Sequence, residues 1–212
     1  VADLKTLNGK TSEDIKVDAK EITGTGALLE ALYTPAAGFT NLGNENVKVD
    51  AGASLANLNA IAKATTGVVT ATVTEANATA VNTALADLGT GGLDKLTLVL
   101  TGSAVAADLK ALDAKTSVVV DAKGVTTITG LAADVKTVLA ATGIDTTTTV
   151  KADVSGTISA ADANTISKAT TGEVKATVTA DTAAALKSAL AGVSNDGVDA
   201  LTLTVNGTTA AA

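Results

Sequence analysis

The segment SLANLNAIAKATTGVVTATVTE at 54–75 recurs as SAADANTISKATTGEVKATVTA at 159–180. Farther along the chain, LADLGTGGLDKLTLVLTG at 85–102 recurs as LAGVSNDGVDALTLTVNG at 190–207. Both recurrences have the same offset of 105 residues, so the second half of the sequence nearly repeats the first. Self-similarity at a fixed spacing is typical of stacked repeat architectures.

The 212 residues therefore comprise two copies of one unit, about 1–105 and 106–212. Each copy contains four shorter units, in which a small-residue amphipathic run and a turn precede an alternating run and a second turn. The eight units begin near Ala2, Gly26, Ser54, Glu75, Val105, Gly130, Ser159 and Thr179. Units of about 26 residues are within the range over which solenoid repeats stack. We expect a single solenoid over 1–212.

The first run of each unit has helical periodicity. In 54–63, Leu58 and Ile61 fall on one face after Ser54, which is a natural N-cap. The copy keeps Ser159 as the cap and places Asp162 three residues later, in a capping-box-like position. Comparable apolar stripes include Leu4 and Leu7, Leu29 and Leu32, Val81 and Leu85, Leu109 and Leu112, Val135 and Val138, and Leu186 and Leu190.

The second run of each unit alternates with period two, which predicts strands with one buried face and one exposed face. The residues predicted to point inward are Ile15, Val17, Ala19, Val69, Ala71, Val73, Leu96, Leu98, Leu100, Val174, Ala176, Val178, Leu201, Leu203 and Val205. Threonines, with some Lys and Asp, occupy the positions between them.

A helix of about ten residues and a strand of about five have similar lengths, so one unit closes on itself as a coil with every strand in the same direction. The expected fold is a right-handed α/β solenoid of about eight coils, with a parallel β-sheet on one side and short helices on the other. Neither end has an obvious polar cap. Terminal strands such as 201–205 are therefore expected to pair with neighbouring chains or to fray.

Composition excludes several kinds of function. The chain has no Cys, His, Met, Trp or Arg, so thiol nucleophiles and imidazole bases are absent, and we predict no enzymatic activity. A net charge of −7 without Arg argues against nucleic acid as a partner. Every apolar stretch is interrupted before the roughly 18 residues that span a bilayer, so no membrane insertion is expected.

Two candidate sites emerge from the residue pattern. The exposed strand face offers a surface for binding, with candidates Lys16, Asp18, Thr70, Thr72, Thr97, Lys175, Thr177 and Thr202. T-x-T rows on a flat sheet suit ice binding, but interspersed Lys and Asp break the rows, so a solvated β-branched surface is the better explanation. No cofactor is expected apart from calcium, for which the loop SNDGVD offers oxygen donors from Asn195, Asp196 and Asp199. A tight turn explains the same residues.

Three segments resemble known tandem arrays: AADLKALDAKTSVVVDA at 106–122, and ATTGxVxATVT at 64–74 and at 169–179. They resemble the Ala/Thr/Val/Asp-rich tandem arrays of very large secreted bacterial surface proteins, including S-layer and RTX-type adhesin-like proteins. This resemblance implies an extracellular location at the bacterial cell surface and a scaffold or adhesive role. The G-G-x-G-x-D calcium nonapeptides of RTX segments do not occur here.

Three functions follow as hypotheses. The first is a non-enzymatic structural module that acts as a spacer or lattice scaffold, with neighbouring repeats of the same parent chain as partners and self-assembly as a further mode. The second is an adhesin segment that binds a glycan or another cell surface. The third is an ice-binding solenoid.

Overall fold

The computed structural model describes residues 1–34, 38–50, 53–88, 92–193 and 198–207. Within this part of the chain, eight helices alternate with short strands, and every strand pair of described register is parallel. The expected α/β class with parallel strands is confirmed. The chain separates into two compact units, Val1–Val99 with Ala111–Val120, and Leu100–Lys110 with Asp121–Ala212.

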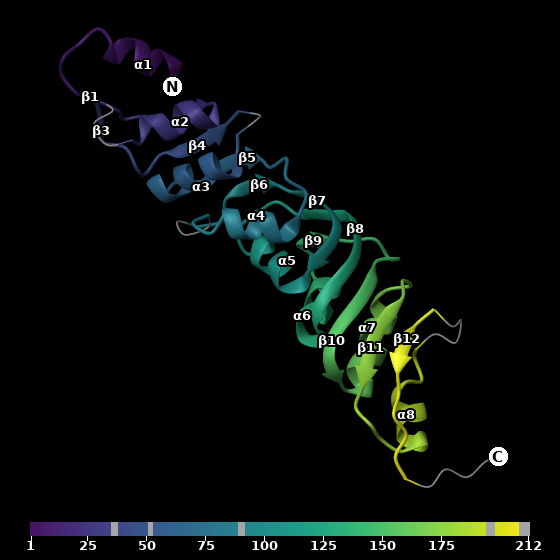
Figure 1. The fold of residues 1–212 in the computed structure, drawn as a ribbon. Coiled ribbons are helices and arrows are strands. Elements are labelled where there is room, and N and C mark those ends of the chain that lie inside the picture. The colour runs from purple at the N-terminus through teal and green to yellow at the C-terminus, as the bar shows by residue number, and fades with distance from the viewer. Residues whose placement is uncertain (35–37, 51–52, 89–91, 194–197, 208–212) are drawn as a thin grey trace. The chain divides into compact units, whose positions relative to one another are not determined.

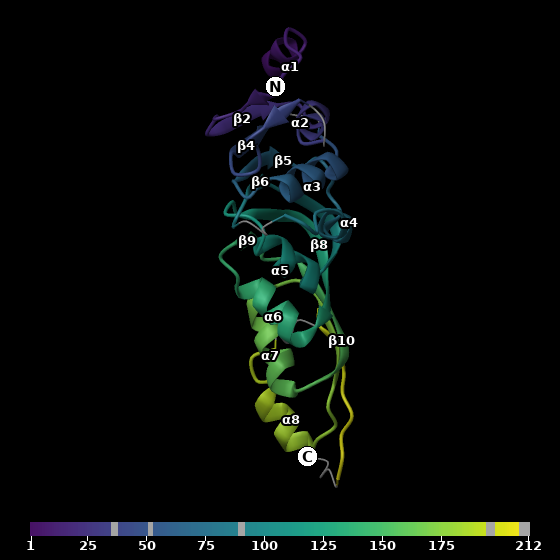
Figure 2. The same cartoon turned by 90° about the vertical axis from the view of Figure 1, so that its left-hand side faces the viewer.

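The first unit carries a four-stranded parallel sheet in the order β2-β4-β5-β6 and a separate pair, β1-β3. Helices α2, α3 and α4 lie along one side of the larger sheet (Figures 1 and 2). The elements are α1 (Ala2–Asn8), β1 (Ile15–Lys16), β2 (Glu21–Gly24), α2 (Gly26–Leu32), β3 (Phe39–Thr40), β4 (Asn46–Val49), α3 (Leu55–Ala64), β5 (Val69–Thr72), α4 (Ala78–Ala84) and β6 (Lys95–Thr97).

The second unit carries a six-stranded sheet in the order β12-β11-β10-β8-β7, with β9 also paired to β8. Helices α6, α7 and α8 follow one another along one face of this sheet (Figures 1 and 2). The elements are β7 (Val99–Val105), α5 (Ala106–Asp113), β8 (Val120–Leu131), α6 (Ala132–Ala140), β9 (Ile144–Asp145), β10 (Lys151–Ile158), α7 (Ala160–Ala169), β11 (Val174–Val178), α8 (Ala183–Ala189) and β12 (Ala200–Thr202). Helix α5 ends in the first unit.

Strand pairing divides into three sheets in the described residues, whereas the sequence predicted one. Strands of only two residues, such as β1, cannot extend a ladder far. The predicted alternation holds through Val17, which is buried, but fails at Ala19, which is exposed rather than inward. The reason is that β1 stops before Ala19, so no neighbouring strand fixes its side.

Helix starts follow the capping residues that the sequence indicated. Ser54 Oγ accepts from the Asn57 N–H at 3.1 Å, and Ser159 Oγ accepts from the Asp162 N–H at 3.0 Å. The reciprocal half of the capping box forms at Ser54, where Asn57 Oδ1 accepts from the Ser54 N–H at 3.3 Å. At Ser159 the cap accepts from the Asp162 N–H as predicted, and the Asp162 carboxylate also accepts from Lys136, a partner that the sequence did not indicate. A full charge on Lys136 attracts a carboxylate more strongly than an amide does.

The alternation predicted for the central strands is confirmed. Val69, Ala71 and Val73 in and after β5 are each at most 5% exposed, and their threonine neighbours face outward. The same holds for Leu96, Leu98 and Leu100, and for Val174, Ala176 and Val178. Helical leucines and isoleucines pack behind them, so each unit has a thin core between one sheet and one row of helices. The fully buried large side chains include Leu29, Leu58, Ile61, Leu85, Leu109, Leu112, Ile128 and Ile166.

Burial fails at the two ends of the described chain. Leu7 is 56% exposed and α1 buries none of its residues, although the sequence placed Leu4 and Leu7 on an inward stripe. Leu203 is 45% exposed and Val205 is 48% exposed, although both were predicted to point inward. These side chains have the predicted sequence pattern but are exposed in the described part of the chain.

Candidate functional site

The exposed face of the first unit's sheet holds three of the predicted surface residues. Thr70 of β5 is aligned with Lys48 of β4 on one side and with Lys95 of β6 on the other. One step along the same strands, Thr72 is aligned with Thr97. This face is therefore a mixed threonine and lysine surface. One row aligns two threonines, Thr72 and Thr97, whereas in the next row Thr70 lies between two lysines.

In the second unit, Thr177 of β11 is aligned with Thr202 of β12. Lys175 lies one row away, aligned with Asp153 of β10, and its Nζ is 3.4 Å from Asp153 Oδ2. The predicted binding residues of this unit thus do lie on adjoining strands. Lys175, however, already has an acidic partner on the neighbouring strand.

Further ion pairs neutralise the same face. Lys151 Nζ is 3.1 Å from Glu173 Oε2, and Lys123 pairs with Asp145. The hydrogen bond from Lys123 to the Asp145 carboxylate raises the pKa of the Lys123 ammonium above its usual value. Solvent screens exposed pairs of this kind, so their main effect is on the surface charge. Their alternating signs leave this face without a strong excess of either charge.

Lys16 and Asp18 lie apart from the other candidates of the first unit. Lys16 belongs to β1, which pairs with β3 and not with the four-stranded sheet. Its ammonium contacts Asp18 Oδ2 at 3.0 Å, and Asn41 donates to the other carboxylate oxygen of Asp18 at 2.6 Å. The eight predicted surface residues are therefore distributed over three sheets.

Of the calcium candidates, Asn195 and Asp196 lie outside the described residues. Asp199 uses both carboxylate oxygens within the chain: Oδ1 accepts from the Val174 N–H at 2.8 Å and Oδ2 from the Ser167 hydroxyl at 2.6 Å. Its counterpart in the first copy, Asp94, accepts from the Val69 N–H at 2.8 Å. The shared contact gives this position a structural task in both copies. Among the described residues, no group of three carboxylates gathers where it could hold a metal ion.

A buried carboxylate that sequence reasoning missed lies in the first unit. Glu45 is 3% exposed, and its carboxylate accepts from the Tyr33 hydroxyl and from the Gly43 N–H at 2.8 Å. Burial, followed by the hydrogen bond to Glu45 and its charge, raises the pKa of Tyr33 well above the usual value of a phenol. Both groups are satisfied by each other and by the backbone, which is the arrangement of a structural network.

Three buried threonines form the most regular polar feature. Each donates its hydroxyl to the backbone oxygen of the residue twenty positions earlier, and each accepts from the N–H two positions later. The donor pairs are Thr65 with Glu45, Thr116 with Leu96, and Thr170 with Val150. The acceptor pairs are Thr65 with Gly67, Thr116 with Val118, and Thr170 with Gly172. We call them the bracing threonines, because each ties one turn to the preceding strand.

A close approach of the backbone explains the glycine of the ATTG motif. A Cβ at Gly67 would overlap the backbone oxygen of Glu45, and a Cβ at Gly172 would overlap the backbone oxygens of Thr149 and Val150. The turn therefore runs so close to the preceding strand that only glycine fits. Sequence reasoning missed these threonines because a threonine-rich chain offers many candidates and burial depends on the neighbouring turn.

No protein-family model, curated protein or solved structure matches the chain. None of the helices in the described ranges is both long and apolar enough to cross a membrane.

Proposed function

We propose that this chain is a non-enzymatic structural module of a bacterial cell-surface or S-layer-like protein, in which it acts as a spacer or lattice scaffold. In this proposal the eight helix-and-strand units are coils of a right-handed α/β solenoid. The single observation that carries the proposal is the recurrence of the bracing threonines. Polar groups that are buried and bonded in the same way in three of the eight units serve the architecture, whereas a catalytic or binding centre is required at one place only.

The remaining buried polar groups support the same interpretation. Glu45 and Asp94 both accept from backbone N–H groups. All described groups of this kind are used to hold turns against strands. The extracellular location rests on the resemblance of the repeat motifs to secreted bacterial arrays.

Solution scattering from the 212-residue chain and from a tandem fusion of two copies tests the proposal. A solenoid module adds length without thickness, so the maximum dimension should grow by about 40–80 Å for eight further coils, at about 5 Å per strand to about 10 Å per helix. The cross-sectional radius of gyration should stay unchanged. A compact fusion whose cross-section increases would overturn the proposal.

One observation favours the adhesin alternative. A shallow polar hollow of about 190 Å³ on the exposed face of the second unit's sheet is lined by Lys151, Asp153, Glu173 and Lys175, among others. Alternating donors and acceptors of this kind can bond sugar hydroxyls. A glycan array distinguishes this function, because a signal that is lost in Lys151→Ala and Asp153→Ala variants would favour adhesion over a purely structural role. Thermal hysteresis would identify the ice-binding alternative.

A further inference from the structure

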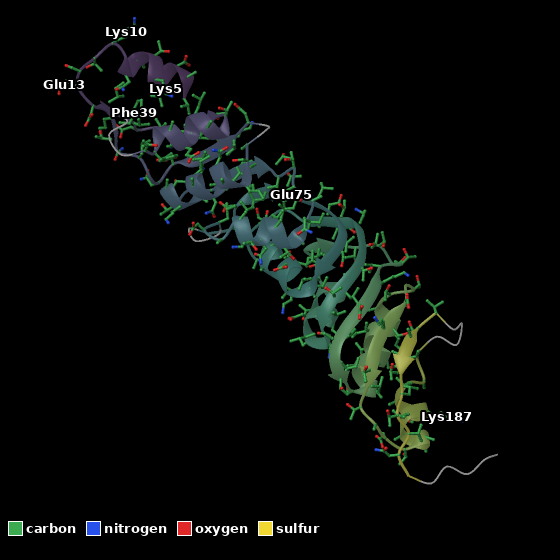
Figure 3. The ribbon with its side chains drawn as sticks, viewed as in Figure 1. Lys5, Lys10, Glu13, Phe39, Glu75 and Lys187 are labelled. Carbon is green, nitrogen blue, oxygen red and sulfur yellow. The ribbon has the colours of Figure 1, made fainter. Side chains whose placement is uncertain are left out.

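The C-terminal end of the second unit carries an open apolar groove of about 510 Å³ between α8 and the chain around β12. We call it the tail groove. Leu203 and Val205 line it and are about half exposed, and Leu186 forms its buried wall. Lys187 of α8 lies at its border (Figure 3). Exposed apolar grooves with a polar border mark interaction sites.

In the first copy of the repeat, the equivalent surface is buried. The positions equivalent to Leu203 and Val205 are Leu98 and Leu100, which are 1% and 0% exposed. Leu98 and the segment 111–120 both belong to the first unit, where this segment continues the edge of the sheet beyond β6 through a parallel bridge between Asp94 and Thr116.

Side chains of this segment secure it to the edge. Thr116 Oγ1 accepts from the Leu96 N–H and donates to the Leu96 oxygen, both at 3.0 Å. Lys115 Nζ contacts the Ala86 and Leu88 oxygens at 3.4 and 3.5 Å. The repeat places Leu201, Ala191 and Val193 at the corresponding positions of the tail.

The N-terminal segment of the chain is a second copy of this covering segment. ADLKTLNGKTS at 2–12 matches ADLKALDAKTS at 107–117, with eight of eleven residues identical. Yet Leu7 is 56% exposed where Leu112 is fully buried, and Thr11 is exposed where Thr116 is 4% exposed. The head of the chain thus has the apolar and hydroxyl groups of a covering segment with nothing described to cover.

The head also has the backbone conformation of the covering segment. The Lys10 N–H donates to the Leu7 oxygen at 2.9 Å, as the Lys115 N–H does to the Leu112 oxygen at 3.0 Å. The Glu13 N–H donates to Thr11 Oγ1 at 3.0 Å, as the Val118 N–H does to Thr116 Oγ1 at 3.1 Å. A segment already in its bound shape loses less entropy on association.

Charge complementarity supports the same partner. In the second unit, Lys110 pairs with Asp134 and Lys136 pairs with Asp162, in each case from the fifth residue of one helix to the third residue of the next. Lys187 is the fifth residue of α8. Asp3 of the head aligns with Asp108, the third residue of α5. A head docked on the tail groove would extend this series with a Lys187–Asp3 pair.

We propose that residues 2–12 of a second copy of this chain dock in the tail groove, with Leu7 covering Leu203 and Val205, and with Thr11 bonded to the Leu201 backbone as Thr116 is to Leu96. The interface is heterologous, so each added copy presents a new tail and assembly is open-ended. This inference rests on the proposed function in that it names the partner of a scaffold module.

Complementary variants test the docking. Leu7→Asp removes the head contact and leaves the tail intact, whereas Leu203→Asp removes the tail contact and leaves the head intact. Sedimentation equilibrium of the unaltered chain should show a mean mass that rises without a plateau between about 1 µM and 1 mM. Each variant alone should stay monomeric over that range, with association weakened at least about tenfold. An equimolar mixture should give a dimer that grows no further.

A matched control is Val99→Asp, which alters an equally exposed valine outside both surfaces and should leave association unchanged. Circular dichroism should show all three variants folded, because the altered side chains are exposed. A zero-length carbodiimide cross-link between Lys187 and Asp3 would locate the contact. An unaltered chain that stays monomeric at about 1 mM, or variants that still associate, would overturn the docking. Neither result affects the scattering test, so the two proposals can fail separately.

Discussion

Thr116 and Leu96 exchange two hydrogen bonds, from the Leu96 N–H to Thr116 Oγ1 and from the Thr116 hydroxyl to the Leu96 oxygen, both at 3.0 Å. A side chain here replaces the backbone partner that a strand would supply. Thr65 and Thr170 make the corresponding contact to backbone oxygens elsewhere, so the fold repeats a hydrogen-bonding device as well as a hydrophobic pattern.

Thr116→Val should destabilise the chain by about 1–3 kcal/mol, because it preserves shape but leaves the buried Leu96 N–H without that acceptor. Thr11→Val changes an exposed copy of the same residue and should alter the stability of the dilute monomer by less than about 0.5 kcal/mol. Urea unfolding followed by circular dichroism measures both. Equal effects would show that the bracing contact has no energetic importance.

Leu98→Ala should cost about 2–5 kcal/mol, because Leu98 is 1% exposed and its loss leaves a cavity. Its neighbour Thr97 is exposed, and Thr97→Ala should cost well under about 1 kcal/mol. The difference between their urea midpoints measures the effect. Midpoints shifted by the same amount would contradict the assignment of the two faces.

Gly67→Ala and Gly172→Ala should each destabilise the chain by about 1–3 kcal/mol, because the added methyl group meets backbone that cannot move aside. Gly9→Ala is the matched control. The nearest atom to a Cβ there is the Thr6 oxygen at 3.6 Å, and the second copy has Ala114 at this position. Thermal unfolding should show Gly9→Ala as neutral or slightly stabilising.

Tyr33 should resist ionisation in the folded chain, because burial and the adjacent Glu45 carboxylate raise its pKa. The folded form therefore favours the protonated phenol, and stability should fall as pH rises above about 10, the usual pKa of tyrosine. Tyr33 is the only tyrosine and there is no tryptophan, so absorbance at 295 nm reports on it alone. A simple titration near pH 10 in the folded chain would contradict the buried pair.

Asp162 should contribute to acid sensitivity, because the hydrogen bonds from Lys136 and Ser159 lower its pKa. Its stabilising effect is present above about pH 4, the usual pKa of an aspartate, and is lost as pH falls through the lowered value. Melting temperatures between pH 6 and pH 2 should therefore fall less steeply in Asp162→Asn than in the unaltered chain. Lys136→Met should flatten the curve similarly, and an unchanged slope in both variants would refute the pair's role.

Local sequence was sufficient to predict the role of a residue whose neighbours along the chain recur in both copies of the repeat. Ser54 and Ser159 cap helices as predicted, and Val69 and Val174 point inward as predicted, because capping and strand alternation depend on a few neighbouring residues. The eight expected helices are likewise present among the described residues.

Local sequence did not predict the contacts of a residue whose partner lies in a neighbouring helix-and-strand repeat. Asp162 has the spacing of a capping box, but its carboxylate bonds Lys136, which is 26 residues earlier. Leu7 and Leu203 have inward-pointing patterns but remain exposed, since burial requires a following or preceding unit. The division into separate sheets was missed for the same reason, because sheet continuity depends on pairing between units.

Strand pairing within each unit joins residues that are close in sequence. Paired residues are 20 to 25 positions apart in every described register, from Thr157 with Thr177 to Glu21 with Asn46. Chains with such low contact order fold quickly, because each loop closure is short and costs little entropy. A nascent chain can thus form one strand pair after another as it emerges, and gain or loss of one helix and strand in evolution would leave the remaining pairings intact.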